Sequence, residues 1–432
     1  MLKGDIYYPE DKIPFARLLP MGLQHVVAMF GATVLAPLLM GFNPQVALFF
    51  SGVGTLLFIV ATRLKVPSYL GSSFAFIGPV LAVTGGDASK LPFALCGIAG
   101  AGVLYLIAAL ITIRWGSGWI DWLMPPIVTG SVVALIGLNL ASSAVTNAIN
   151  ARLVVNSTAD LPALFIAAAT FLTAALVPLH LKGFLRLLPI LAGVIVGYLL
   201  AALLGVLDPG SLARIHDAAW IGLPPFQAPA FSLRALVVIA PMFIVLVAEN
   251  KGHIAAISSY MGRDLNPHLG RAYLGDALAT LLSALGGGTP QTTYAENMGV
   301  MAITRVFSTY NFIMAASVAI LLGLCPKFGA LIQSIPMPVL GGVSLMLYGL
   351  ITLMGVRIWI DARLDFADPH NLVVAGASLI TATGLGVKGL TIAGVNIAGI
   401  AIGTLLAILL NTGLSIGRKS GDASRHEHDL PR

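Results

Sequence analysis

The sequence predicts an all-α polytopic membrane protein of about fourteen transmembrane segments, built as two inverted halves of seven. Three observations predict this fold: the apolar composition, the distribution of basic residues, and motifs that recur in both halves. Of the 432 residues, 57% are hydrophobic and 10% are charged, and the mean hydropathy is +0.92. Soluble domains of this length carry much more charge, so the composition indicates an integral membrane protein.

Apolar runs long enough for membrane helices recur along the chain, each needing roughly 20 residues. The 47 Gly and 25 Pro suit this class, because both are commoner in membrane helices than in soluble ones. The polar start, 1–12, is expected to be a cytoplasmic tail. The expected segments are 17–40, 46–62, 70–85, 91–113, 119–138, 163–179, 187–206, 232–250, 270–286, 290–305, 309–325, 338–356, 371–387 and 392–416.

The basic residues fall unevenly on the two sides of this arrangement. An even number of segments puts both termini on one side, and that side holds 18 of the 24 Lys and Arg residues. By the positive-inside rule this side is the cytoplasm. The sequence therefore predicts a multi-pass protein of the cell membrane with both termini inside.

Three short motifs occur twice and in the same order. They pair 72–75 with 292–295, 126–130 with 338–342, and 193–201 with 399–407. Equivalent segments are seven apart, and seven is odd, so the members of each pair cross the membrane in opposite directions. Such inverted repeats are typical of secondary transporters, with the ligand site where the halves meet.

The stretch 286–305 places helix breakers, polar residues and Glu296 at lipid depth. A charged side chain at the bilayer centre costs roughly 2.5 to 3.5 kcal/mol, and irregular backbone is tolerated there only where protein or water satisfies it. We expect segments three and ten to be discontinuous, opening with extended residues 69–74 and 292–294. Two such strands can pair antiparallel, and the half-helices that follow then aim free N–H groups at the midplane. The alternative is an ordinary Gly-Pro kink.

Three acidic residues fall inside apolar segments: Glu249, Asp276 and Glu296. Glu249 and His253 are four residues apart and share one helix face. A carboxylate removed from water takes up a proton more readily, and an imidazole offers a partner for that proton, so this pair is a candidate for proton coupling. The alternatives are that Glu249 caps the cytoplasmic end of segment eight and that Asp276 hydrogen-bonds the interrupted backbone.

Other polar residues in apolar surroundings are candidates for supporting roles. Gln24 and His25 form a polar pair early in segment one, although a buried structural histidine would look the same. Arg305 closes segment ten, where an anchoring arginine is expected in any case. Tyr348 could close over a ligand or hold a local hydrogen bond.

These residues resemble the nucleobase–ascorbate transporter family, in particular its bacterial uracil permease branch. The family motif is Gln, Glu or Pro, then Asn-x-Gly-x-x-x-x-Thr, then Arg, Lys or Gly. It stands here complete, from Glu296 and Asn297 to Thr304 and Arg305. The Gln24-His25 pair matches the family's Gln-His pair, and the stretch 249–253 is similar to the uracil-type motif of segment eight.

The resemblance implies a proton-coupled nucleobase importer, with uracil as the expected substrate and a homodimer as the expected assembly. It implies a core of 1–114 and 232–337 that slides against a gate of 115–231 and 338–417, with a cytoplasmic tail at 418–432. Two residues depart from the uracil branch: Ala295 stands where Gly is common, and Asp276 is more familiar from the purine branch.

Uracil alternates N–H donors and C=O acceptors around a flat ring, and the candidate site suits this pattern. Glu249 and Glu296 are expected to accept from the two N–H groups, and backbone N–H groups near Phe74 and Ala295 to donate to the carbonyls. Phe74 or Tyr294 would cover the ring. The complete expected set adds Ser73 to the substrate site, His253 to proton coupling, and as supporting residues Gln24, His25, Asp276, Asn297, Thr304, Arg305 and Tyr348.

The alternatives are a xanthine or purine permease of the same family and an anion exchanger on the same inverted repeat. Half-helix N-termini suit anions, but two acidic residues would repel one. The sequence has no filter-like rings and no His-Glu-x-x-His motif, so neither a channel nor an enzyme is predicted. Cys96 and Cys325 match no metal spacing and are expected to pack, so no cofactor, metal or catalytic residue is predicted. The basic residues are scattered over loops, so no nucleic-acid partner is expected.

Overall fold

The computed structural model describes residues 6–149, 161–182, 186, 188–387, 389–392 and 395–416. The expected tail, 418–432, lies outside these residues. The elements are α1 (Phe15–Met40), α2 (Pro44–Ala61), β1 (Leu70–Ser72), η1 (Phe74–Phe76), α3 (Ile77–Thr84), η2 (Ala88–Lys90), α4 (Leu91–Trp115), α5 (Gly118–Leu123), α6 (Pro126–Ile149), α7 (Leu161–His180), α8 (Pro189–Leu203), α9 (Pro209–Asp217), α10 (Leu233–Ile239), η4 (Ala240–Met242), α11 (Phe243–Met261), η5 (Asn266–His268), α12 (Leu269–Leu285), β2 (Gln291–Thr293), α13 (Ala295–Thr304), α14 (Thr309–Gly323), α15 (Pro326–Gln333), α16 (Met337–Asp361), α17 (Pro369–Leu385), β3 (Leu390–Ile392), β4 (Val395–Ile397) and α18 (Gly399–Ile416).

The architecture is helical, and the described helices include several that suit a membrane. Seven are long and apolar enough to cross one, and the pair α14 and α15, bent by 84°, would make eight. The stretch 74–84 and the helices α8 and α18 are also apolar but shorter. The chain is therefore built as a multi-pass membrane protein, in which several of the expected segments are shorter than a full crossing helix.

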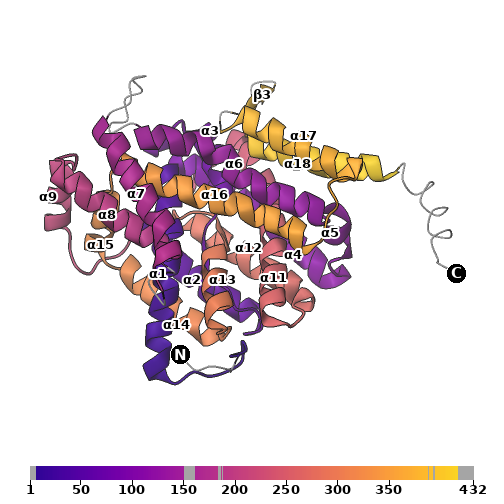
Figure 1. The fold of residues 1–432 in the computed structure, drawn as a ribbon, viewed down its shortest axis with the longest axis horizontal. Helices are drawn as coiled ribbons and strands as arrows, with labels where there is room; N and C mark the ends of the chain where they lie inside the picture. Colours follow the sequence, from indigo (N-terminus) through magenta and orange to yellow (C-terminus); the bar gives the residue numbers. More distant parts are fainter. Residues whose placement is uncertain are drawn as a thin grey trace.

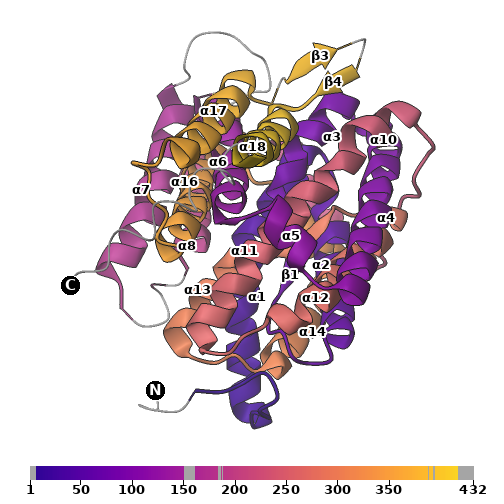
Figure 2. The ribbon, with the colours of Figure 1, turned by 90° about the vertical axis from the view of Figure 1, so that its right-hand side faces the viewer.

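The helices pack in two groups (Figure 1). The first group contains α1 to α4 and α10 to α15, and the second contains α6, α7, α8, α16, α17 and α18. Turning the molecule shows α7, α8, α16, α17 and α18 on one side and α2, α4, α12 and α14 on the other (Figure 2). Both groups mix elements from the beginning and the end of the chain, so neither could form from one contiguous stretch.

Close packing of α6 against α16 holds the second group together. A Cβ atom on Gly355 would lie 2.4 Å from Ala134 N and 2.4 Å from Gly130 O, which are backbone atoms of α6. One on Gly137 would lie 2.2 Å from Tyr348 O. Small residues thus let the two backbones approach closely, as in other membrane helix pairs.

Three expected segments have wrong boundaries, and one of them, segment five, ends at Ile149 instead of 138. Helix α11 continues to Met261 instead of ending at 250, so Glu249 lies inside a helix and the alternative that it caps a helix end is wrong. Segment five begins at Pro126, because Pro125 and Pro126 separate it from the short helix α5. Segment fourteen begins at Gly399, because a hairpin of β3 and β4 precedes α18.

The N-terminal segment lies against the ends of two helices of the first group. Tyr7 forms a parallel bridge with Val306, directly after α13. Arg263, directly after α11, donates a 2.8 Å hydrogen bond to Glu10 and lies 3.4 Å over the Tyr8 ring. The hydrogen bond from Arg263 holds the pKa of Glu10 below its ordinary value. The segment therefore ties α11 and α13 together at their C-terminal ends.

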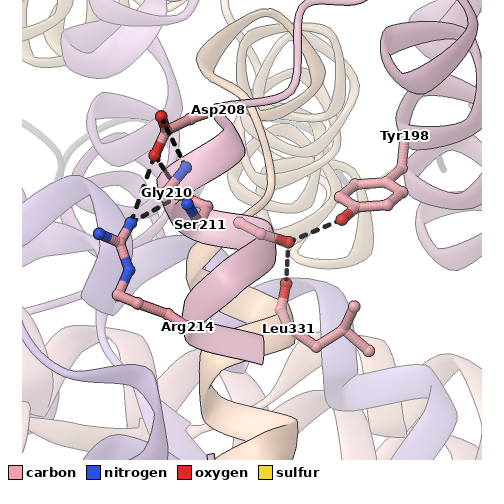
Figure 3. Close-up of polar contacts among 7 residues, drawn as sticks. Tyr198, Asp208, Gly210, Ser211, Arg214 and Leu331 are labelled. Atoms are coloured by element: carbon pink, nitrogen blue, oxygen red, sulfur yellow. Dashed lines mark hydrogen bonds and ion pairs between the residues drawn. The ribbon is translucent and has the colours of Figure 1, made fainter. Parts of the chain in front are cut away.

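A polar contact joins α8 of the second group to the end of α15 in the first group. The hydroxyl groups of Tyr198 in α8 and Ser334, which follows α15, lie 2.8 Å apart, and Ser334 also donates to Leu331 O (Figure 3). Nearby, Asp208 caps the N-terminus of α9 by accepting from the backbone N–H of Ser211 at 2.9 Å (Figure 3). Helix α9 in turn packs on α15, so this end of the two groups is tethered.

The packing of α6 on α16 makes Gly355→Ala destabilising. The added methyl group meets backbone atoms that cannot rotate away, and overpacking of this kind costs about 1–3 kcal/mol. We expect a lower melting temperature for purified Gly355→Ala protein. Gly349→Ala on the same helix is the control, because its Cβ has no atom within 4 Å. Equal melting temperatures for the two variants would contradict this account of the helix pair.

Candidate functional site

Two short strands from distant parts of the chain pair inside the first group. Strand β1 runs antiparallel to β2, with Leu70 opposite Thr293 and Ser72 opposite Gln291. Further backbone bonds extend the pair, from Ser73 N to Pro290 O at 2.9 Å and from Tyr294 N to Tyr69 O at 3.0 Å. The sequence predicted extended residues at both places and their antiparallel pairing, and the structure has both, except that Phe74 already belongs to η1.

Hydroxyl groups of neighbouring helices satisfy the outer edges of this strand pair. Thr55 in α2 accepts a 2.9 Å hydrogen bond from Leu70 N. Thr280 in α12 accepts from Gln291 N at 3.0 Å and donates to Gln291 O at 3.1 Å. An isolated two-stranded ribbon would leave these backbone groups without partners, which is costly in an apolar interior.

Each strand leads directly into a helix that starts beside the strand pair. Strand β1 continues into η1 and α3, and β2 continues into α13. Ser73 and Tyr294 occupy the two N-cap positions, and neither uses its side chain to cap the helix. The first N–H groups of a helix have no helical partner, so both helix starts retain free donors.

A small cavity of about 30 Å³ lies next to these helix starts. Six predicted site residues line it: Phe74, Glu249, His253, Tyr294, Ala295 and Glu296. Both glutamates are half-buried. Five further residues that the sequence analysis missed complete the lining: Val133, Thr292, Thr293, Ile351 and Met354.

Hydrogen bonds connect the α11 side chains to the strand segments. Ser73 Oγ donates to Glu249 Oε2 at 3.3 Å. The predicted Ser73 therefore contacts a cavity residue but does not itself line the cavity. His253 Nδ1 lies 2.8 Å from Thr293 Oγ1. Glu249 and His253 do share one face, as their spacing predicted, but the hydroxyl partner of the imidazole is on β2.

Asp276 belongs to a buried polar cluster beside the cavity. Asn250 donates to its carboxylate, and Tyr105 Oη donates to the same oxygen at 3.4 Å. Asp276 and Asn250 are both fully buried. The partners of Asp276 are thus side chains of α11 and α4, and the alternative that it hydrogen-bonds the interrupted backbone is wrong.

His25 and Asn297 join α1 to α13. Asn297 Nδ2 lies 3.1 Å from His25 Nδ1 and also donates to His25 O at 3.1 Å. The His25 ring packs at 4.5 Å on the Phe312 ring. Both residues support α13 behind Glu296, while the adjacent Gln24 is half-buried and does not line the cavity.

The two aromatic candidates have different surroundings. Tyr294 is held by β1, because its hydroxyl donates to Ser72 O at 3.3 Å and accepts from Thr33 at 3.4 Å. Its ring lies where a Cβ on Gly71 would be. Phe74 makes an edge-to-face contact at 5.9 Å with the ring of Tyr348 in α16. Tyr348 therefore contacts Phe74 but does not itself line the cavity.

Two predicted supporting residues lie away from the cavity. Arg305 is exposed at the C-terminal end of α13, with a φ of 56°, and its carbonyl accepts from Tyr7 N. Thr304 Oγ1 donates to Val300 O within α13. They end the helix that carries Glu296, and neither lines the cavity.

A second, larger cavity of about 320 Å³ adjoins the first. Val133, His253 and Met354 line both. Lys251, Arg357 and Asp361 also line the larger cavity. Lys251 forms a 2.8 Å ion pair with Asp121 of α5, and Arg357 lies 3.6 Å from Asp361.

Comparison with known proteins finds relatives over almost the whole chain. The model of the Permease family (Xan_ur_permease) matches residues 16–393. The "Putative pyrimidine permease RutG" of Escherichia coli (strain K12) is 45% identical over 96% of this chain and 93% of that relative. The uracil permease of Bacillus caldolyticus is 41% identical over 93% of this chain and 93% of its own length.

Solved structures of more distant proteins share the fold. The murine Solute Carrier 26 family member A9 anion transporter in the inward-facing state matches with a TM-score of 0.69 and 12% identity, covering 95% of this chain and 70% of that chain. The transmembrane domain of the cyanobacterium bicarbonate transporter BicA matches with a TM-score of 0.61 and 15% identity, covering 93% and 99%. At such identities the likeness shows a common fold alone.

The buried cluster of Asn250 and Asp276 predicts strong coupling between the two residues. Either residue changed to Ala leaves the other with a lost partner in an apolar interior, which costs about 1–3 kcal/mol. The double variant removes both groups, so it should lose less stability than the two single variants together. Melting temperatures of the four purified proteins test this. Strictly additive losses would mean that the contact contributes nothing of its own.

Proposed function

Since this chain belongs to the Permease family, we propose that it imports a nucleobase, with uracil as the substrate, together with protons. One observation carries this proposal: Glu249 and Glu296 line one cavity beside the free N–H groups of two helix starts. Its relatives carry the names uracil permease and pyrimidine permease. Residues from both helix groups line this cavity.

The donor and acceptor pattern of the site matches that of uracil. The carboxylates of Glu249 and Glu296 accept from the two ring N–H groups, and the backbone N–H groups at Phe74 and Ala295 donate to the carbonyls. Phe74 packs on the ring. Ser73 holds Glu249 in place through its 3.3 Å hydrogen bond.

Proton coupling follows from the neutrality of the substrate. Uracil brings no charge to offset two carboxylates in a closed site, so closing the site costs less once a proton is bound there. Glu249 and His253 are the groups that would carry it, with Thr293 holding the imidazole. Asp276, fully buried beside Asn250, supports α11 from behind.

Transport would proceed by movement of the two helix groups against each other. In this proposal the core is 1–114 and 232–337, which contain the helices of the first group, and the gate is 115–231 and 338–417, which contain those of the second. Ligand cavities usually measure about 300–1,000 Å³, whereas the cavity at Glu249 and Glu296 measures about 30 Å³. A ring therefore enters only when the gate moves away from the core.

The remaining expectations complete this proposal. The chain would cross the membrane about fourteen times as an inverted repeat, with the segments of β1 and β2 discontinuous and both termini in the cytoplasm. The small Gly and Ala residues of the gate suit a further helix contact, as in the expected homodimer. The cell membrane is the expected location.

The cavity lining argues against the alternative functions. Among its described residues the lining contains two carboxylates and neither Lys nor Arg, which disfavours an anion such as sulfate or bicarbonate. A purine permease would need space for a second ring. Thermal stabilisation by a panel of uracil, thymine, xanthine, bicarbonate and sulfate separates these classes.

The two carboxylates predict a binding defect when either is neutralised. Hydrogen bonds to charged groups contribute about 1.5–3 kcal/mol, so Glu249→Gln and Glu296→Gln should each weaken uracil binding by roughly ten- to a hundredfold. Stabilisation of the purified variants by uracil measures this. Asp217→Asn, which neutralises an exposed carboxylate at the end of α9 and away from the site, is the control. Wild-type affinity in both site variants would remove these carboxylates from the ligand contacts.

Replacing His253 should impair uracil uptake much more than uracil binding. His253→Ala keeps both carboxylates, so uracil should still bind, while accumulation in vesicles driven by a pH gradient should fall sharply. Binding and uptake are measured on the same preparation. Equal losses in the two assays would argue against a coupling role, and wild-type uptake that ignores the pH gradient would refute proton coupling itself.

A further inference from the structure

The small cavity and the larger one meet at two side chains of the second helix group. Val133 in α6 and Met354 in α16 line both cavities, together with His253 from α11. A molecule that passes between the cavity at the carboxylates and the larger cavity must therefore pass Val133 and Met354.

Along this route the lining side chains of α6 and α16 change from apolar to polar. On α16, Ile351 and Met354 line the small cavity, while Arg357 and Asp361 line the larger one. On α6, the polar Thr129 lines only the larger cavity and Val133 lines both. Helical spacing of three or four residues puts each set on one face. The apolar part of that face lines the same cavity as the carboxylates.

The lining of the small cavity divides its chemistry between the two groups. Its charged and hydroxyl-bearing side chains come from the first group, on α11, β2 and α13. The second group contributes Val133, Ile351 and Met354, which can offer a ligand only shape and apolar contact.

The uracil ring has the same division. Its N–H and C=O groups occupy four consecutive ring positions, and the remaining edge, C5 and C6, carries only C–H groups. When the polar positions bind the carboxylates and backbone N–H groups, the apolar edge faces the opposite wall. Apolar contact there leaves no polar group unpaired.

We propose that Val133, Ile351 and Met354 form the wall that determines which substituent the site accepts at ring position 5. This inference rests on the proposed nucleobase substrate and adds its specificity determinant. A methyl group at C5 adds volume toward this wall, while every polar contact of the ring stays the same. Size selection at an apolar wall usually discriminates by about 10- to 200-fold per methylene group.

Met354→Ala tests the wall, and the chain offers a matched control. Leu353, its neighbour on α16, is 62% exposed and lines neither cavity, so Leu353→Ala removes a side chain of similar size elsewhere. We expect Met354→Ala to bind thymine and 5-bromouracil about tenfold better relative to uracil. Leu353→Ala should keep the wild-type ratio.

Competition by uracil, thymine and 5-bromouracil for radiolabelled uracil binding gives these ratios in purified protein. An unchanged ratio in Met354→Ala, with uracil binding retained, would overturn the proposal. Val133→Ala provides the same test should Met354→Ala fail to fold, with the same expected direction. Absence of uracil binding in the wild-type protein would instead contradict the proposed function.

Discussion

Backbone hydrogen bonding without water is the constraint on which this structure depends. Residues 69–73 and 290–294 lie in an apolar interior in extended conformation, where each unpaired N–H or C=O group is costly. The antiparallel pair of β1 and β2 satisfies the inner groups, and Thr55 and Thr280 satisfy groups at the outer edges. With the strand pair secured, two helices can begin in the middle of the molecule and leave their first N–H groups free for a ligand.

Much of the first helix group serves to hold this arrangement in place. Asn297 connects α13 to α1 through His25, and Tyr294 connects it to β1 through Ser72. The N-terminal segment binds the far ends of α11 and α13. These contacts keep the two helices that carry Glu249 and Glu296 in a fixed relation, which a site with two converging carboxylates requires.

In the proposed mechanism the second group has a different role, which its packing suits. Close contact of α6 and α16 through glycines makes a rigid pair whose face toward the site is apolar. An apolar face can separate from a polar one without breaking hydrogen bonds, so relative movement of the groups costs little at the site itself. Polar contacts between the two parts lie outside the small cavity, at Tyr198 and Ser334 and at Lys251, which pairs with Asp121.

The membrane class, the two extended stretches and most of the polar residues that line the candidate cavity could be predicted from the sequence, although Thr292 and Thr293 were missed. Polar residues are conspicuous in apolar runs. Burying Glu249, His253 or Glu296 is unfavourable, so such residues are expected there only where they have a function. Which apolar residues line the cavity beside these polar residues depends on how the helices pack. Val133, Ile351 and Met354 resemble their neighbours in composition, and the docking of α6 and α16 selects them. The extent of α11, the β3–β4 hairpin and the partners of Asp276 also depended on packing between segments far apart in the chain, which no local pattern records.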